Sequence, residues 1–173
     1  LVRATTSDAV AALGLARPNV ARTLGAALVC FFLAFAVQGG LGPLWASALR
    51  AVGVTETEQP LARLMFDVPR DQRALVVVLG VAVVPFLEEF LFRGFLQPAL
   101  ARYVPVGAAI ALTSVVFGAL HGLEAFVPIV GLSCVLGLAR ERTASVWVPW
   151  VMHALNNGAA FALLWHSSAS PGA

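Results

Sequence analysis

Five long runs of apolar residues dominate the chain, and shorter polar segments separate them. A transmembrane helix needs about 20 mainly apolar residues, so each run predicts a helix that crosses a bilayer. Strands of a membrane barrel would alternate apolar and polar residues, whereas these runs are continuously apolar. The predicted fold class is all-α, a polytopic transmembrane helical bundle with about five or more spans. The expected spans lie at about residues 24–44, 74–102, 104–121, 126–139 and 146–165.

The composition also indicates a membrane protein. Hydrophobic residues make up 60% of the chain and charged residues 12%, against about 45–50% and about 25% in soluble domains. The 173 residues suit a single membrane domain over residues 1–173, because one domain commonly has this length. Within it we expect a juxtamembrane segment at 1–20 and a flexible tail at 167–173. The apolar composition predicts the lipid bilayer as a partner, and a net charge of +2, without a basic stripe among aromatics, predicts no nucleic acid.

The distribution of arginine predicts the orientation of the bundle. All 11 basic residues are arginine, a coding bias that favours a bacterial source and therefore the bacterial inner (plasma) membrane. Cytoplasmic loops carry the excess of basic residues, and this rule favours an N-terminus inside. The chain does not begin with methionine, so we expect it to be a piece of a longer protein, and the sequence does not tell whether membrane helices precede it. The inner side would hold Arg3, Arg17, Arg22, Arg102, Arg140 and Arg142, and the outer side Arg50, Arg63, Arg70 and Arg73.

A few ionisable residues interrupt the apolar runs. Such residues are rare and costly within a span and suggest function by default. Glu89 and Arg93 are four residues apart, so on a helix their side chains can form a neutralising ion pair. That pair leaves Glu88, about 100° round the helix, less well placed to share the arginine. A carboxyl group without a partner in an apolar site is suited to proton transfer, which makes Glu88 the acid expected to do chemistry.

Two histidines occur in the later spans. His121 lies one helical turn after Phe117, while His153 and Asn157 lie at i and i+4 and share a helix face. Taken alone, His121 suits an interfacial position, and the second pair suits a hydrogen bond between helices. Counted at ~1.5 Å per residue, however, Glu88, His121 and His153 lie roughly 21, 25 and 15 Å from the inner turns. We therefore expect these groups to converge within the bundle.

Convergent Glu88, His121, His153 and Asn157 suit the hydrolysis of an amide bond. A carboxylate and a histidine can take a proton from water as general base. A second histidine and an asparagine amide can stabilise the developing oxyanion. A zinc site formed by Glu88, His121 and His153, with one open position, is the alternative. The spacing does not decide between the two, although the soluble zinc-protease motif HExxH is absent.

Three motifs resemble those of the CPBP intramembrane proteases, also called the CAAX prenyl protease 2 (Rce1-like) or Abi family. The motifs EExxxR, FxxxH and HxxxN occur here in order, at residues 88–93, 117–121 and 153–157. The resemblance covers about residues 74–164. It implies an integral membrane endopeptidase with a helical core, a fold that agrees with the apolar runs.

The resemblance also implies roles for the site residues. Glu88 with His121 would activate the water molecule, and His153 with Asn157 would hold the oxyanion. The two remaining residues, Glu89 and Arg93, would support the site, the arginine by orienting or neutralising the acids. The family is often named as metalloproteases, yet a metal-free glutamate mechanism is also argued for it. Asn157 suits an oxyanion donor better than a zinc ligand, which favours the glutamate mechanism.

The implied substrate is a membrane-anchored peptide or protein that is cleaved near its terminus. Eukaryotic members of the family remove the last three residues of prenylated CAAX proteins, whereas bacterial members are linked to peptide maturation, self-immunity, signalling and sorting-signal cleavage. The alternative function is a non-catalytic scaffold or a transporter-like bundle, since polar residues in spans also mark ion pathways. A transporter would more often show internal repeats and paired broken helices, and the sequence shows neither.

Overall fold

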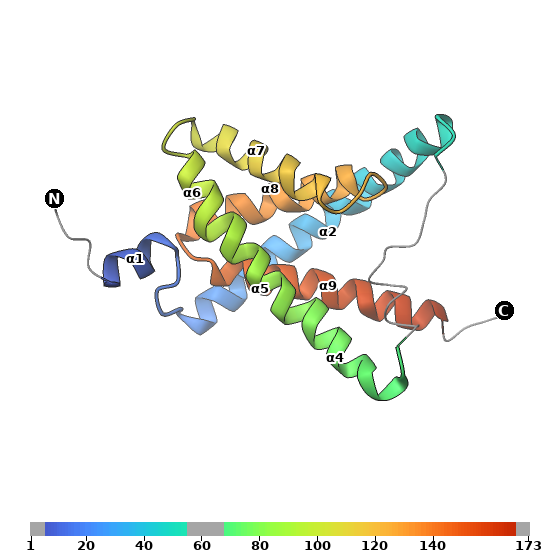
Figure 1. Cartoon of the computed structure of the whole chain (residues 1–173), viewed down its shortest axis with the longest axis horizontal. Coiled ribbons are helices and arrows are strands. Elements are labelled where there is room, and N and C mark those ends of the chain that lie inside the picture. Colours follow the sequence, from blue (N-terminus) through green and yellow to red (C-terminus); the bar gives the residue numbers. More distant parts are fainter. Residues whose placement is uncertain (1–5, 55–67, 169–173) are drawn as a thin grey trace.

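The computed structural model describes residues 6–54 and 68–168, and every regular element within these ranges is helical. Within these ranges the structure has five helices and, between α2 and α7, one long helix made of several segments, which can be followed in Figure 1. The five helices are α1 (Thr6–Ala12), α2 (Val20–Ala51), α7 (Val106–Ala119), α8 (Phe126–Thr143) and α9 (Trp147–Ser168). Three parts of the sequence to which predictions apply lie outside the described residues. They are Arg3, the middle of the predicted outer loop with Arg63, and residues 169–173 of the predicted tail.

The segmented helix changes its geometry twice along its length. Two π-helical stretches, η2 and η3, flank the short helix α5 that carries the adjacent glutamates. π-helical turns are rare in proteins and frequently occur at functional sites. The segments are η1 (Arg70–Gln72), α4 (Arg73–Val78), η2 (Leu79–Val83), α5 (Val84–Glu89), η3 (Phe90–Leu96) and α6 (Gln97–Leu100).

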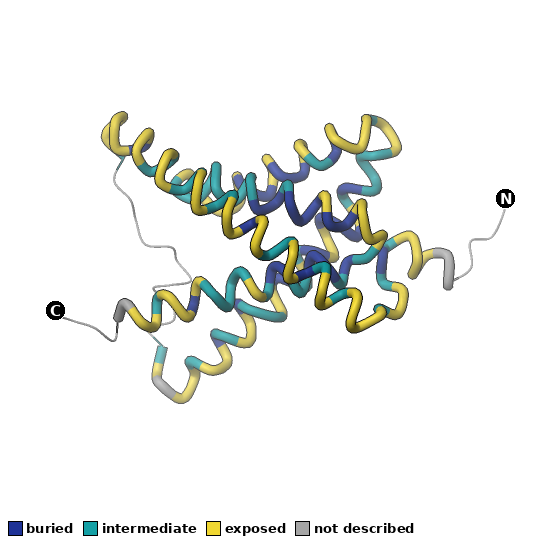
Figure 2. The backbone as a smooth tube through the Cα atoms, turned by 180° about the vertical axis from the view of Figure 1, so that it is seen from behind, coloured by how far each residue is buried: buried dark blue, intermediate teal, exposed yellow. Residues whose placement is uncertain are grey.

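The central helix of the bundle is α8, which contacts α2, α7, α9 and η3. Its small and aliphatic residues pack into one core with small residues of α2 and with α9. This core consists of Ala27, Ala34, Leu132, Val135, Leu136, Ala139, Val148 and Met152. Figure 2 shows that buried residues gather where the helices cross, whereas the outward ends of the helices are exposed. Exposed apolar side chains such as Val29 and Phe32 on α2 suit contact with lipid.

The five predicted apolar runs all fold as helices, close to the expected positions. Two helices are long and apolar enough to cross a membrane, namely Val20–Ala51 and Arg73–Leu100. The apolar helix Val106–Ala119 has 14 residues and is therefore about 21 Å long, which is shorter than a hydrocarbon core of about 30 Å. The structure thus indicates an integral membrane protein, and the count of five spans stays a prediction.

The two ends of the bundle carry different connections. Figure 1 shows α1, the start of α2, the α6–α7 turn and the α8–α9 turn at one end. The end of α2, the start of α4 and the end of α9 lie at the opposite end. Among the described arginines, Arg17, Arg22, Arg102 and Arg142 are therefore carried at one end and Arg50 and Arg73 at the other, while the orientation of the bundle in a membrane stays a prediction. Arg140 differs from the other arginines of its group, because it is only 8% exposed and lies within the bundle.

The segment after α1 is docked on the bundle through its backbone carbonyls. The carbonyl of Ala12 accepts a hydrogen bond from Arg140 Nη2 at 3.1 Å. The carbonyl of Gly14 accepts from the backbone N–H of Val146 at 3.0 Å. These contacts tie the expected juxtamembrane segment to α8 and to the α8–α9 turn, which lie beside the candidate site.

Candidate active site

A proline fixes the geometry at the N-terminal side of the adjacent glutamates. Pro85 has no N–H, so in the π-helical turn of η2 the carbonyl five residues earlier has no backbone partner. That carbonyl belongs to Gly80, and it accepts a hydrogen bond from Asn157 Nδ2 at 2.9 Å. Trp150 Nε1 binds a second carbonyl of η2, that of Ala82, at 2.9 Å. Side chains of α9 therefore dock on the widened turn that leads into the glutamates.

A second proline has the same effect on the C-terminal side. Pro98 lacks the N–H that the carbonyl of Arg93, five residues earlier in η3, would bind. This carbonyl accepts a hydrogen bond from Arg140 Nε at 3.1 Å. Because Arg140 also binds the carbonyl of Ala12, one buried guanidinium joins η3, α8 and the segment after α1.

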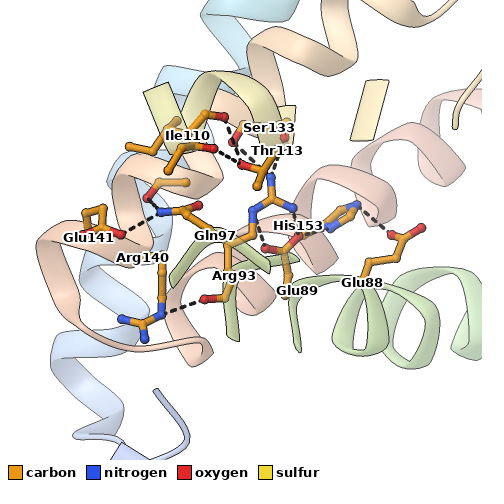
Figure 3. Close-up of polar contacts among 12 residues, drawn as sticks. Glu88, Glu89, Arg93, Gln97, Ile110, Thr113, Ser133, Arg140, Glu141 and His153 are labelled. Carbon is orange, nitrogen blue, oxygen red and sulfur yellow. Dashed lines mark hydrogen bonds and ion pairs between the residues drawn. The ribbon is translucent and has the colours of Figure 1, made fainter. Parts of the chain in front are cut away.

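The side chain of Glu89 is fully buried, with no exposed surface. Its Oε1 lies 3.3 Å from Arg93 Nη1 and 2.8 Å from His153 Nδ1. Its Oε2 lies 3.3 Å from Arg93 Nε, a contact too poorly aligned for a hydrogen bond but short enough for an ion pair. The ion pair expected between Glu89 and Arg93 is thus present, and Figure 3 shows that the same carboxylate also holds the imidazole.

The guanidinium of Arg93 has further partners on α8 and α7. Its Nη2 donates to the hydroxyl of Ser133 at 2.6 Å and to the carbonyl of the same residue at 3.0 Å. The guanidinium carbon lies 4.8 Å from the centre of the Phe117 ring, within the range of a cation–π contact. A buried charge is costly unless it is paired and hydrogen-bonded, and here both conditions are met.

The residue one turn further on, Gln97, continues this polar contact with α8. Its amide Nε2 donates to the carbonyl of Gly137 at 3.1 Å and to Glu141 Oε1 at 2.8 Å. A Cβ atom at Gly137 would lie 2.9 Å from Gln97 Oε1 and 2.9 Å from Ile110 Cγ2. The close approach of the three helices at this point therefore depends on glycine.

His153 stands between the two glutamates. Its Nδ1 faces Glu89, and its Nε2 lies 3.8 Å from Glu88 Oε2. The histidine side chain is 3% exposed, whereas that of Glu88 is 28% exposed. The distance to Glu88 is too long for a direct hydrogen bond, so both groups can bind one small molecule between them. The buried glutamate fixes the ring, and the other glutamate stays accessible.

His121 lies just beyond the C-terminal end of α7. Its Nδ1 is 2.7 Å from the carbonyl of Phe117, and the two rings are 4.5 Å apart. The Phe117 ring also lies 5.9 Å from that of His153 and therefore spaces the two imidazoles. His121 is close enough to Glu88 for an electrostatic interaction with its carboxylate. With Nδ1 bound to the backbone, Nε2 is the nitrogen left for the site.

A cavity of about 560 Å³, here called the central cavity, brings the four predicted residues together. Glu88, His121, His153 and Asn157 all line it, and most of its other lining residues are apolar ones of α4, η2, α5, α8 and α9, with Leu120 just after α7. Pockets with a few convergent polar groups in an apolar wall are typical of active sites. The predicted convergence is therefore present, while the roles of the four residues stay predictions.

A family model described as type II CAAX prenyl endopeptidase Rce1-like matches residues 70–159. The chain belongs to this Rce1-like family. It is also similar to "Putative membrane peptidase YdiL" of Bacillus subtilis (strain 168), with 26% identity over 132 residues. The match covers 76% of this chain and 52% of that protein, so the chain spans about half the length of this relative. No solved structure matches the chain.

The Rce1-like match begins after α2, yet α2 contributes to the site. Gln38 of α2 lines the central cavity, and its Nε2 donates to Asn156 Oδ1 at 2.7 Å. Sequence reasoning missed both residues, although the doubled asparagine at 156–157 and the lone amide within the first apolar run were signals for them. It also missed Ser133 and Arg140, which act through tertiary contacts that spacing along one helix does not reveal.

The zinc alternative is not supported by the arrangement of the Rce1-like site. Among the described residues, no three His, Cys, Asp or Glu side chains are placed to hold one metal ion. The ring nitrogens of His121 include one bound to its own helix. These residues do not fit a zinc site as they stand.

Proposed function

We propose that this chain is the core of an intramembrane endopeptidase that hydrolyses a peptide bond of a membrane-associated protein or peptide near its terminus. The observation that carries the proposal is the central cavity, in which one accessible carboxylate, two imidazoles and three amides share a mainly apolar wall. Membership of the Rce1-like family supports a peptidase, and so does the name of the Bacillus subtilis relative.

In the proposed reaction, Glu88 acts as the general base. Its carboxylate takes a proton from a water molecule in the central cavity, and the water oxygen attacks the carbonyl carbon of the scissile bond. When the C–N bond breaks, the same carboxyl group returns the proton to the leaving amine. The products are a new carboxylate and a new amine. His121 lines the same cavity, and in the proposal its Nε2 orients the water.

His153 and Asn157 stabilise the oxyanion that forms during the attack. With the Nδ1–H of His153 directed at Glu89, its Nε2 points toward the cavity, and in the imidazolium form Nε2 also carries a proton that it can donate to the oxyanion. Asn157 uses one amide proton for the carbonyl of Gly80 and keeps the other for the reaction. Glu89 with Arg93 fixes the imidazole and does not touch the substrate.

Product formation by the purified protein tests the proposal. The protein is reconstituted in liposomes with a library of membrane-anchored peptides, in water labelled with heavy oxygen, and products are identified by mass spectrometry. We expect cleavage at one position of some peptides, with one labelled oxygen in the new carboxyl group. Peptide binding or solute transport by the wild-type protein, without any product, would support a scaffold or a transporter instead.

Glu88→Gln is the variant that tests the mechanism, and Glu141→Gln is its matched control. Both changes remove one carboxylate from a helix, but Glu141 lies outside the central cavity, where its Oε1 accepts a hydrogen bond that a glutamine can also accept. We expect product to disappear with Glu88→Gln and to persist with Glu141→Gln. Normal cleavage by folded Glu88→Gln would contradict the proposed role of this glutamate.

Metal dependence is tested on the same preparation. Metal content is measured on the purified protein, and cleavage is compared before and after treatment with a chelator. The glutamate mechanism predicts cleavage that survives chelation. Stoichiometric zinc that is lost together with activity would overturn the metal-free version and leave the endopeptidase assignment in place.

A further inference from the structure

A second cavity, of about 340 Å³ and here called the arginine cavity, lies at one end of the bundle. Its walls are the loop after α1, the first turns of α2 and the α8–α9 turn. Figure 1 places these three segments at the same end of the molecule. The arginine cavity and the central cavity have no lining residue in common, so a ligand here would be separate from the proposed chemistry.

The charged side chains described in the wall of the arginine cavity are all positive. Arg17, Arg22 and Arg142 line it, and among the residues whose side chains the structure describes no aspartate or glutamate does. Among the side chains that the structure describes, in residues 9–54, 68–69 and 71–166, none provides these three guanidinium groups with an ion pair or a hydrogen-bond acceptor. Arg140 provides the contrast, because it is buried and donates to two backbone carbonyls. Three cations around one hollow repel one another, and an anion between them removes that repulsion.

The remaining polar groups of the arginine cavity can also donate to an anion. The hydroxyl oxygen of Ser145 accepts from the backbone N–H of Trp147 at 3.1 Å, which leaves its own proton free to be donated. Thr23 contributes a second hydroxyl, and α2 begins at Val20 directly beside it. Arginine presents a planar fork that binds phosphate oxygens in pairs. The donor set therefore suits a phosphate group, with its several acceptor oxygens.

The surroundings of the arginine cavity suit a lipid better than a soluble phosphate. The indole Nε1 of Trp147 donates to the carbonyl of Ala16 in the wall of the cavity at 3.0 Å, and tryptophan is enriched at the membrane–water interface. From the same end of the bundle, α2 presents apolar side chains outward, including Leu24 at 48% and Leu28 at 47% exposure. Acyl chains could lie along this surface while the headgroup occupies the cavity.

We propose that the arginine cavity binds the phosphate of an anionic phospholipid headgroup in the leaflet at this end of the bundle. The inference does not depend on the proposed peptidase activity. It is therefore tested on Glu88→Gln protein as well as on wild-type protein. Equal lipid binding by both separates this site from the central cavity, so either proposal can fail without the other.

The experiment measures lipid retention and stabilisation of the purified chain. The protein is placed in nanodiscs of phosphatidylcholine with or without phosphatidylglycerol, and bound lipids are counted by native mass spectrometry after release. We expect one phosphatidylglycerol molecule to be retained per chain and the unfolding temperature to rise. Separate arms add inorganic phosphate or glycerol 1-phosphate to phosphatidylcholine nanodiscs. Equal stabilisation by either soluble phosphate would overturn the lipid assignment.

Variants distinguish a built site from general surface charge. A charge-assisted hydrogen bond is worth about 1.5–3 kcal/mol, so Arg142→Gln should weaken phosphatidylglycerol binding roughly tenfold to a hundredfold. Arg102→Gln removes the same charge at the same end, in the α6–α7 turn and outside the cavity, and should change binding less than about twofold. Arg142→Lys, which keeps the charge without the fork, should give an intermediate loss. Equal losses in Arg142→Gln and Arg102→Gln would overturn the proposal.

Discussion

Glu88 and Glu89 are neighbours in the sequence and lie in opposite environments. Glu89 has no exposed surface, and Arg93 and His153 hold its carboxylate, with Ser133 behind the arginine. Glu88 has a side chain that is 28% exposed, and it opens onto the central cavity. We call the first environment the closed side and the second the open side. On the closed side the polar groups bind one another, so the groups on the open side are free to bind a substrate.

The difference between the two sides also explains why a costly pair of acids persists in an apolar segment. A buried charge is tolerated when partners surround it, and on the closed side these partners come from η3, α8 and α9. The result is an imidazole whose Nδ1 is fixed and whose Nε2 faces the open side. The open side therefore depends on the closed side, because the ion pair on the closed side orients the imidazole that faces the open side.

Removing the negative charge of each glutamate in turn is the strongest test of the difference between the closed side and the open side. Glu88→Gln should lower turnover by about 10²–10⁴-fold, the usual contribution of a general base, with little change in the unfolding temperature. Glu89→Gln should lower the free energy of unfolding by about 3–5 kcal/mol, because it leaves the buried Arg93 without its counter-charge. Turnover on a cleaved peptide and thermal unfolding in detergent are measured for both variants.

A double variant provides the control for Glu89. Replacing Arg93 by Met in the Glu89→Gln background removes the unpaired cation and should recover part of the lost stability. If Glu88→Gln unfolds while Glu89→Gln stays folded but loses activity, the roles that we assign to the two glutamates are wrong and must be exchanged.

Much of this arrangement could be predicted from local sequence patterns. The helices follow from continuous apolar runs, and the Glu89–Arg93 pair follows from the i, i+4 spacing on one helix. The convergence of His121 and His153 with Glu88 follows from their depth along antiparallel helices. These predictions succeed because each depends on one helix or on helix length alone.

The features that the sequence did not reveal depend on how separate helices meet. Ser133 and Arg140 bind the segmented helix from α8, and nothing in their own helix marks them as partners. Gln38 reaches Asn156 from the first apolar run, which lies outside the region of the family resemblance. The π-helical turns also escaped prediction, although Pro85 and Pro98 free the two carbonyls that site residues bind. Which side chain binds each of these two carbonyls depends on how the helices pack against one another, and the pattern along a single helix does not show this.

On the open side, Asn157 provides the next largest expected effect. Asn157→Ala removes the proposed oxyanion donor and should lower kcat by about 10²–10³-fold. The adjacent variant Asn156→Ala is the matched control, because its amide binds Gln38 and should affect KM more than kcat. Steady-state kinetics on one cleaved peptide separates the two parameters. A larger fall in kcat for Asn156→Ala would move the oxyanion role to that residue.

On the closed side, Ser133 should contribute to stability more than to chemistry. Ser133→Ala removes the 2.6 Å hydrogen bond to Arg93 Nη2 and should cost about 1.5–3 kcal/mol, the usual value for a bond to a charged group. Ser114→Ala is the control, since that hydroxyl is also fully buried and has no hydrogen-bond partner among the described residues. It should be nearly neutral. Equal unfolding temperatures for the two variants would show that the closed side does not depend on this contact.

The smallest expected effect concerns packing at two helical glycines. At Gly137, next to Gln97 on the closed side, an added Cβ would lie 2.9 Å from two other atoms. Gly137→Ala should therefore destabilise the protein by about 1–3 kcal/mol, less the gain from replacing glycine in a helix. At Gly158 on α9 the nearest atom would be 3.8 Å away, at Val81, so Gly158→Ala should stabilise the protein by about 0.5–1 kcal/mol. Opposite shifts in unfolding temperature would support a tightly packed closed side, whereas two stabilised variants would show that α8 can move away from Gln97.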